Sequence, residues 1–178
     1  MYRLMFIPLF LLVLLSGCAV EVKTLKSPRA DFSAYKSFCW LNGCEVTASG
    51  NPMISDTLLQ GRLQRAIVKE MKVKGLRLDA QNPDLLVGVY VTLKDEHQLV
   101  YRRQDDLPVF WPSKAETEML NYLKGTIVVA MAERQSGTLV YESIGVRYME
   151  LNPRLTRGDV RRVVRGILAG YPVPGKKP

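Results

Sequence analysis

The sequence predicts an α+β domain, a two-layer sandwich in which an antiparallel or mixed sheet of about four to five strands carries two helices on one face. Two observations predict this class. Two segments repeat apolar residues every three or four positions, as one face of a helix does, and other segments repeat them every second position, as strands do. The resulting order is strand, helix, strand or short extended piece, strand, long loop, hairpin, helix, which suits a single sheet covered by two helices.

The strands are predicted from runs of β-branched and aromatic residues. The first covers about 34–41 and the clearest covers about 84–93. A hairpin follows, with strands near 123–133 and 138–149 joined by a short turn. The polar and charged residues 94–118 interrupt this pattern, so we expect a long loop there.

Two amphipathic helices are predicted. The first covers about 55–72, begins at Ser55 and carries an apolar stripe of Leu59, Leu63, Ala66, Ile67 and Met71. A short extended stretch at 76–78 follows it. The last helix is expected to begin at Thr156, because Thr156 and Asp159 have the spacing of a capping box. Its apolar stripe comprises Val160, Val163, Val164, Ile167 and Leu168.

The N-terminal segment has the pattern of a bacterial lipoprotein precursor. Arg3 is followed by about a dozen apolar residues, fewer than the roughly 20 that a membrane-spanning helix needs. This is typical of a secretory signal peptide, here residues 1–17. The run Leu15-Ser16-Gly17-Cys18 matches the lipobox, in which small residues precede a cysteine that accepts diacylglycerol and then palmitate. We therefore expect cleavage before Cys18 and lipid attachment to its thiol. The alternative is an ordinary signal peptide with a chance cysteine, or a buried apolar strand.

The rest of the chain has a length suited to one domain. We expect a lipidated tether over 18–30, a single α/β lipoprotein domain over 31–172 and a disordered, proline- and lysine-rich tail over 173–178. In enterobacterial lipoproteins an aspartate after the lipidated cysteine retains the protein in the inner membrane. By resemblance to them, Ala19 implies an outer-membrane protein that faces the periplasm. The inner membrane is the alternative.

The formal net charge of +8 favours anionic partners. Nucleic acid is not expected in the periplasm, so anionic lipid or an acidic cell-wall polymer is the expected counter-charge. Arg161, Arg162 and Arg165 on the last helix are the candidates for contact with such a surface. An ordinary solvated helix face is the alternative for the same three residues.

Two further cysteines lie close together in the sequence. Cys39 and Cys44 flank a strand end and a predicted turn at Asn42-Gly43, so they are candidates for a disulfide in an oxidising compartment. Whether they pair or stay reduced is left open by the sequence. His97 is the single histidine, so neither a metal site nor any other cofactor is expected.

The sequence contains no pattern of nucleophile, base and orienting carboxylate, and no phosphate-binding loop, so we do not expect an enzyme. A binding or assembly module is the main hypothesis, with an envelope protein or a cell-wall polymer as its partner. A small-ligand or lipid carrier is the first alternative, and it requires an apolar cavity between the helices and the sheet. An envelope hydrolase is the second alternative.

Four blocks of the sequence resemble DUF4136, a family of bacterial lipoproteins of unknown function. The blocks are DFSAYKSFCW at 31–40, NPDLLV at 82–87, GTIVV at 125–129 and ILAGYP at 167–172. They lie in the order of the family and span most of the domain. Cys39 departs from the pattern, since a small residue is usual there. The resemblance implies a shared fold and supplies no catalytic residue.

Overall fold

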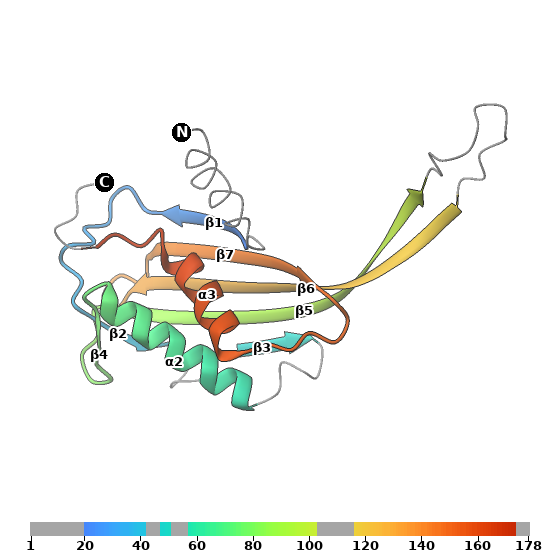
Figure 1. Cartoon of the computed structure of the whole chain (residues 1–178). Coiled ribbons are helices and arrows are strands. Elements are labelled where there is room, and N and C mark those ends of the chain that lie inside the picture. The colour runs from blue at the N-terminus through green and yellow to red at the C-terminus, as the bar shows by residue number, and fades with distance from the viewer. Residues whose placement is uncertain (1–19, 42–46, 51–56, 103–115, 174–178) are drawn as a thin grey trace, which may run out of the picture.

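The computed structural model describes residues 20–41, 47–50, 57–102 and 116–173 of the chain. One mixed sheet and two helices form the described part, and Figure 1 shows both helices in front of the sheet. The predicted α+β class is therefore confirmed. The predicted strand number of about four to five is too low, because the sheet has seven strands.

Six strands of the sheet follow one path, in the order β1, β7, β6, β5, β2, β4, and β3 pairs with β5 beside it. Their bounds are β1 Glu21–Lys26, β2 Ser37–Trp40, β3 Thr47–Gly50, β4 Arg77–Leu78, β5 Leu85–Arg102, β6 Glu116–Glu133 and β7 Leu139–Met149. Strands β1, β7, β6 and β5 pair antiparallel, whereas β2, β3 and β4 run parallel to their neighbours. The parallel strands are possible because helix α2 makes the crossover between β2 and β5.

The two helices match their sequence predictions, except that the predicted start of the first at Ser55 lies outside the described residues. Helix α2 covers Thr57–Val73 and helix α3 covers Arg157–Leu168. The predicted capping box is present, since the Thr156 hydroxyl accepts from the Asp159 amide at 3.2 Å and the Asp159 carboxylate accepts from the Thr156 amide at 3.1 Å. The predicted apolar stripes face the sheet, where Leu63, Ile67, Met71, Val164 and Ile167 are buried.

Alternation along the central strand creates the core. Leu85, Val87 and Val89 of β5 are almost fully buried under the helices, with 0 to 2% of each side chain exposed. Phe38 and Trp40 of β2 add aromatic mass beside them, with their rings edge to face at 6.1 Å. The core thus lies between one face of the sheet and the two helices.

The prediction of a tether over residues 18–30 is partly wrong. Glu21–Lys26 is strand β1, which pairs antiparallel with β7 from Glu21 opposite Val146 to Lys26 opposite Tyr141. The strand lies at the edge of the sheet and carries charged residues that are exposed, so its apolar pattern is weak. The compact domain therefore begins close to the expected lipidation site.

The prediction of a long loop over residues 94–118 is also partly wrong. Strands β5 and β6 continue through residues 94–102 and 116–122, paired in a ribbon that we call the arm, which projects from the body in Figure 1. Leu99 and Met119 are partners across the arm, and both are more than half exposed. Because most of the described side chains of this ribbon are exposed and none of the rest is fully buried, its sequence has no buried alternation to identify it.

The carboxylate of Asp84 joins the start of β5 to the start of β2. Its Oδ2 accepts hydrogen bonds from the Lys36 amide at 2.8 Å, the Ser37 amide at 2.9 Å and the Ser37 hydroxyl at 2.8 Å. The Lys36 amide is the largest cause that holds the pKa of Asp84 below its usual value, with further help from Ser37 and against the effect of burial. The anion is thus the form that this junction stabilises.

We expect Asp84→Asn to lower the free energy of unfolding by about 1 to 3 kcal/mol at neutral pH, because charge-assisted hydrogen bonds are lost. The pKa of Asp84 is lower in the folded state, so its contribution is present above the unfolded pKa of about 3.9 and is lost as the pH falls through the folded pKa. Urea denaturation of the variant should therefore show a weaker loss of stability below about pH 4. Asp95→Asn, at an exposed position in the arm, is the control. Equal acid dependence in wild type and Asp84→Asn would contradict the prediction.

Candidate functional site

The cysteines predicted to carry lipid or to form a disulfide are described only in part. Cys18 and Cys44 lie outside the described residues, so lipid attachment and the Cys39–Cys44 pair both stay predictions. Cys39 is half-buried on β2, and its register partner on β5 is Leu86. It therefore lies on the face of the sheet opposite the helices, because its neighbours Phe38 and Trp40 point into the core.

The three arginines predicted to contact an anionic surface all lie on α3, but they differ in their contacts. Arg161 is exposed. Arg162 lies 4.0 Å from the carboxylate of Asp159 on the same helix. Arg165 places its Nε 3.5 Å from Glu70 Oε1 of α2, and the Glu70 side chain is only 8% exposed. Arg165 thus links the two helices, which the sequence analysis did not foresee.

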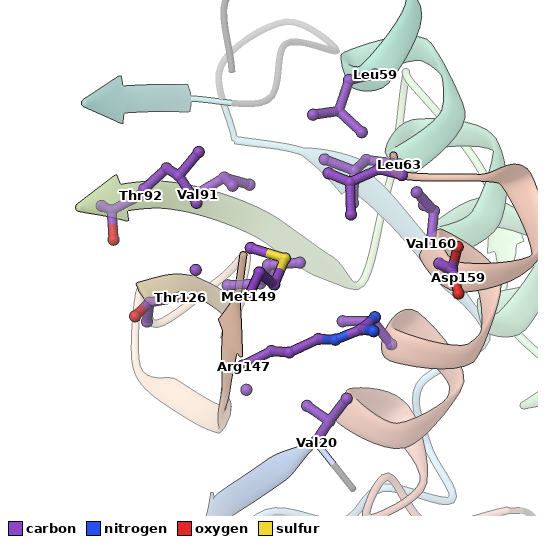
Figure 2. A pocket seen from close by; sticks show the side chains of 16 residues that line it. Val20, Leu59, Leu63, Val91, Thr92, Thr126, Arg147, Met149, Asp159 and Val160 are labelled. Carbon is purple, nitrogen blue, oxygen red and sulfur yellow. The ribbon is translucent and has the colours of Figure 1, made fainter. Parts of the chain in front are cut away.

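A pocket opens between the helices and the sheet (Figure 2). Strands β5, β6 and β7 supply its floor, α2 and α3 supply its walls, and Val20 lies at one end. Its volume is about 70 Å³. Apolar residues dominate the lining, which comprises Val20, Leu59, Leu63, Val91, Thr92, Leu93, Gly125, Thr126, Ile127, Gly145, Arg147, Met149, Leu155, Asp159, Val160 and Val163.

Two glycines shape the floor of this pocket. A Cβ on Gly145 would lie 2.8 Å from Ile167 Cγ1, so this glycine lets α3 approach the sheet. A Cβ on Gly125 would lie 2.8 Å from Met149 Cε, the flexible end of a thioether side chain. The floor is therefore fixed where it meets α3 and adaptable where it meets Met149.

Two charged side chains reach this otherwise apolar pocket. Arg147 extends from β7 toward α3 in Figure 2, and its Nε is buried with no hydrogen-bond partner in the described structure. Asp159 lies on α3, where the hydroxyl of Thr156 is the largest cause that lowers its pKa, and the Thr156 amide, Arg147 and Arg162 lower it further. The exposed surface of the pocket is almost wholly apolar, and Arg147 and Asp159 also line a more polar hollow next to it, beside Tyr148 and Pro153.

Other ionisable groups lie away from the pocket. The His97 ring nitrogen Nδ1 is 2.6 Å from the side-chain oxygen of Asn121, its register partner in the arm. Glu96 lies 3.8 Å from Lys124. No group of three or more His, Cys, Asp and Glu side chains is placed to hold a metal ion within 20–41, 47–50, 57–102 and 116–173. The pocket itself therefore offers apolar contact, and Arg147, which lines both it and the adjoining polar hollow, is the cationic side chain beside it.

The sequence analysis did not identify the pocket or Arg147. One feature of the sequence bears on Arg147. This residue occupies an inward-facing position of β7, in phase with Tyr141, Ser143 and Gly145. A charged residue at an inward position is unusual, since burial of a charge is costly without a partner. The pocket itself combines six separate segments, and no local pattern could reveal it.

Comparison with known proteins identifies a family and a fold. Residues 22–173 match the family described as "Domain of unknown function (DUF4136)". Among curated proteins none matches the chain. A DUF4136 family protein from Bacteroides thetaiotaomicron has a similar structure, with a TM-score of 0.53, 14% identity and coverage of 89% of this chain and 98% of that one.

Two further solved structures are similar. The PelC dodecamer from Paraburkholderia phytofirmans has a TM-score of 0.53 and 10% identity, and the match covers 89% of this chain and 100% of that one. A PDZ domain protein from Parabacteroides distasonis has a TM-score of 0.55 and 17% identity over 89% of this chain. This chain spans only 36% of that protein. At these identities the similarities show the fold.

The ion pair between Arg165 and Glu70 leads to a stability prediction. We expect Arg165→Ala to lower the free energy of unfolding by about 1 to 2 kcal/mol, because it leaves the buried Glu70 carboxylate without its partner. Adding Glu70→Gln should then have little further effect, so a double-mutant cycle measured by urea denaturation should give a coupling of about 0.5 kcal/mol or more. Arg161→Ala, an exposed neighbour on α3, is the control and should change stability by less than about 0.5 kcal/mol. Additive effects of the two substitutions would contradict a direct interaction.

Proposed function

Since this chain belongs to the DUF4136 family, whose function is unknown, we propose its role from its own geometry: a lipid-anchored envelope protein that acts by binding or assembly rather than by catalysis. The anchor is Cys18, which carries two or more acyl chains, as stable attachment requires. The domain faces the periplasm from the outer membrane, and the inner membrane is the alternative site. The resemblance noted in the sequence is confirmed at the level of the family.

The position of β1 supports a domain held close to the bilayer. Strand β1 begins at Glu21, three residues after Cys18, and three residues of extended chain span at most about 10 Å. Strand β1 does not act as a flexible linker, because all six of its residues pair with β7. In the described part of the chain no helix combines the length and apolar character needed to cross a membrane.

The apolar pocket beside Val20 is the observation that carries the binding role. A pocket of apolar walls with a few polar groups is typical of ligand recognition. Its one carboxylate, Asp159, is engaged by Thr156 in the capping box, which disfavours a role as a general base. An envelope hydrolase is therefore the weaker alternative.

The same pocket also favours a second candidate, a small-ligand or lipid carrier. That hypothesis requires an apolar cavity between helices and sheet, and the pocket has this location. A partner protein or a cell-wall polymer is the alternative occupant of the basic surface formed by Arg161 and Arg162. Assembly of several copies is a further form of the same role, since the similar PelC protein is a dodecamer.

We expect Cys18→Ser to abolish lipid attachment, because the hydroxyl cannot replace the thiol that accepts the diacylglycerol. Cells grown with an alkyne analogue of palmitate should label the wild-type protein and not this variant, and the variant should be lost from the outer-membrane fraction of a density gradient. Cys39→Ser removes a thiol on β2 and is the control, which should keep both label and location. Persistent labelling of Cys18→Ser would disprove the anchor.

The proposed partner can be sought by crosslinking in cells followed by mass spectrometry. We expect a reproducible envelope protein or cell-wall fragment, and its recovery should fall roughly 5- to 30-fold in the double variant Arg161→Ala, Arg162→Ala, if each charge contributes about 1 kcal/mol. Lys69→Ala, Lys72→Ala removes the same charge from exposed positions on α2 and is the control. An equal fall in both double variants would show dependence on net charge and would contradict a contact through α3.

A further inference from the structure

We propose that the pocket between the helices and the sheet binds the acyl chain of a single-chain amphiphile, and that Arg147 holds its anionic head group. This inference rests on the proposed function in one respect, that the chain acts by binding. The ligand class is a fatty-acid carboxylate or a related anion drawn from the membrane. The apolar walls, the arginine whose Nε–H has no hydrogen-bond acceptor, and the position of the pocket each support it.

The walls select an aliphatic group. Leu59, Leu63 and Val160 are buried in the helices above the pocket, and Val91 and Leu93 are buried in the strand below. Water inside such a pocket would find few of the polar partners that hold a buried water molecule in place. An alkyl chain needs no polar partners there, and it is stabilised by the burial of its apolar surface.

Arg147 selects the head group. Of the described residues that line the pocket, it is the one cation; it also lines the adjoining, more polar hollow beside Tyr148 and Pro153, and its Nε–H is buried without a hydrogen-bond acceptor. Asp159 does not meet this need. Its Oδ2 accepts from the amide and hydroxyl of Thr156 at 3.1 and 2.6 Å, and its Oδ1 faces Arg162 at 4.0 Å. A carboxylate or phosphate has the geometry that a guanidinium recognises best.

The size of the pocket limits the length of acyl chain that it can hold, and the position of the pocket indicates where that acyl chain comes from. A volume of about 70 Å³ is about half of a roughly 150 Å³ cavity that binds benzene. At its present volume the pocket therefore holds the end of an acyl chain. Movement of the Met149 side chain would admit more of that acyl chain. Val20 at one end of the pocket is two residues from Cys18, so the site lies next to the proposed bilayer, where acyl chains are abundant.

The test uses the full-length lipidated protein in its own membranes. A diazirine-bearing fatty acid of ten to twelve carbons is added, and crosslinked residues are mapped by mass spectrometry. We expect adducts on the pocket lining, and we expect decanoate to compete at least five-fold more strongly than decanol. Val163→Phe, which fills the pocket, should reduce the adducts at least five-fold. Val68→Phe, at another half-buried helical position that lies on α2 and does not line the pocket, should not.

The arginine has its own matched pair of variants. Arg147→Met keeps a long apolar stem and should remove the preference for decanoate over decanol, whereas Arg154→Met removes a neighbouring exposed arginine and should keep it. Adducts scattered over the surface, or an unchanged preference in Arg147→Met, would overturn the inference. So would pocket adducts that form only in Cys18→Ser, because the protein's own acyl chains would then fill the pocket. Loss of palmitate labelling reports separately on the anchor, so the two proposals can fail independently.

Discussion

The three hydrogen bonds that Asp84 Oδ2 accepts from Lys36 and Ser37 are the constraint on which the N-terminal half of the sheet depends. They bring the start of β2 to the start of β5 and so set the parallel register that places Phe38 opposite Leu85. That register turns Phe38 and Trp40 toward the core, with α2 completing the crossover above them. A displaced register would reverse the faces of β2 and expose both rings, because successive side chains of a strand alternate.

A second set of contacts ties the C-terminal helix to the N-terminal strand. The Tyr141 hydroxyl of β7 donates to the Ile167 carbonyl of α3 at 2.8 Å, inside the core. Ser143, one pleat further along β7, lies 3.0 Å from the Thr24 hydroxyl of β1. Strand β7 therefore connects the first strand after Cys18 to the helix that walls the pocket.

The parts of the fold that were predicted from the sequence are those with a covered face. Helices α2 and α3 and the inner half of β5 bury one side, so their apolar spacing is regular. The arm and β1 have little covered surface, and their side chains satisfy no periodic constraint that a pattern could reveal. The short strand β3 owes its form to pairing with β5, which is distant in sequence, whereas β4 lies within the extended stretch predicted at 76–78. The pocket was missed for the same reason, since Gly125 and Gly145 acquire their meaning only from Met149 and Ile167 across the core.

The blocks that carry the family resemblance contain residues whose contacts mainly stabilise the fold. Block 82–87 contains Asp84, which bonds to block 31–40, and Phe32 of that block lies edge to face with Tyr171 of the last block at 5.4 Å. The third block, 125–129, supplies part of the pocket floor. Arg147 lies outside all four blocks. The four blocks therefore account for much of the scaffold and for part of the apolar floor, whereas Arg147 lies between them, within the family match of residues 22–173.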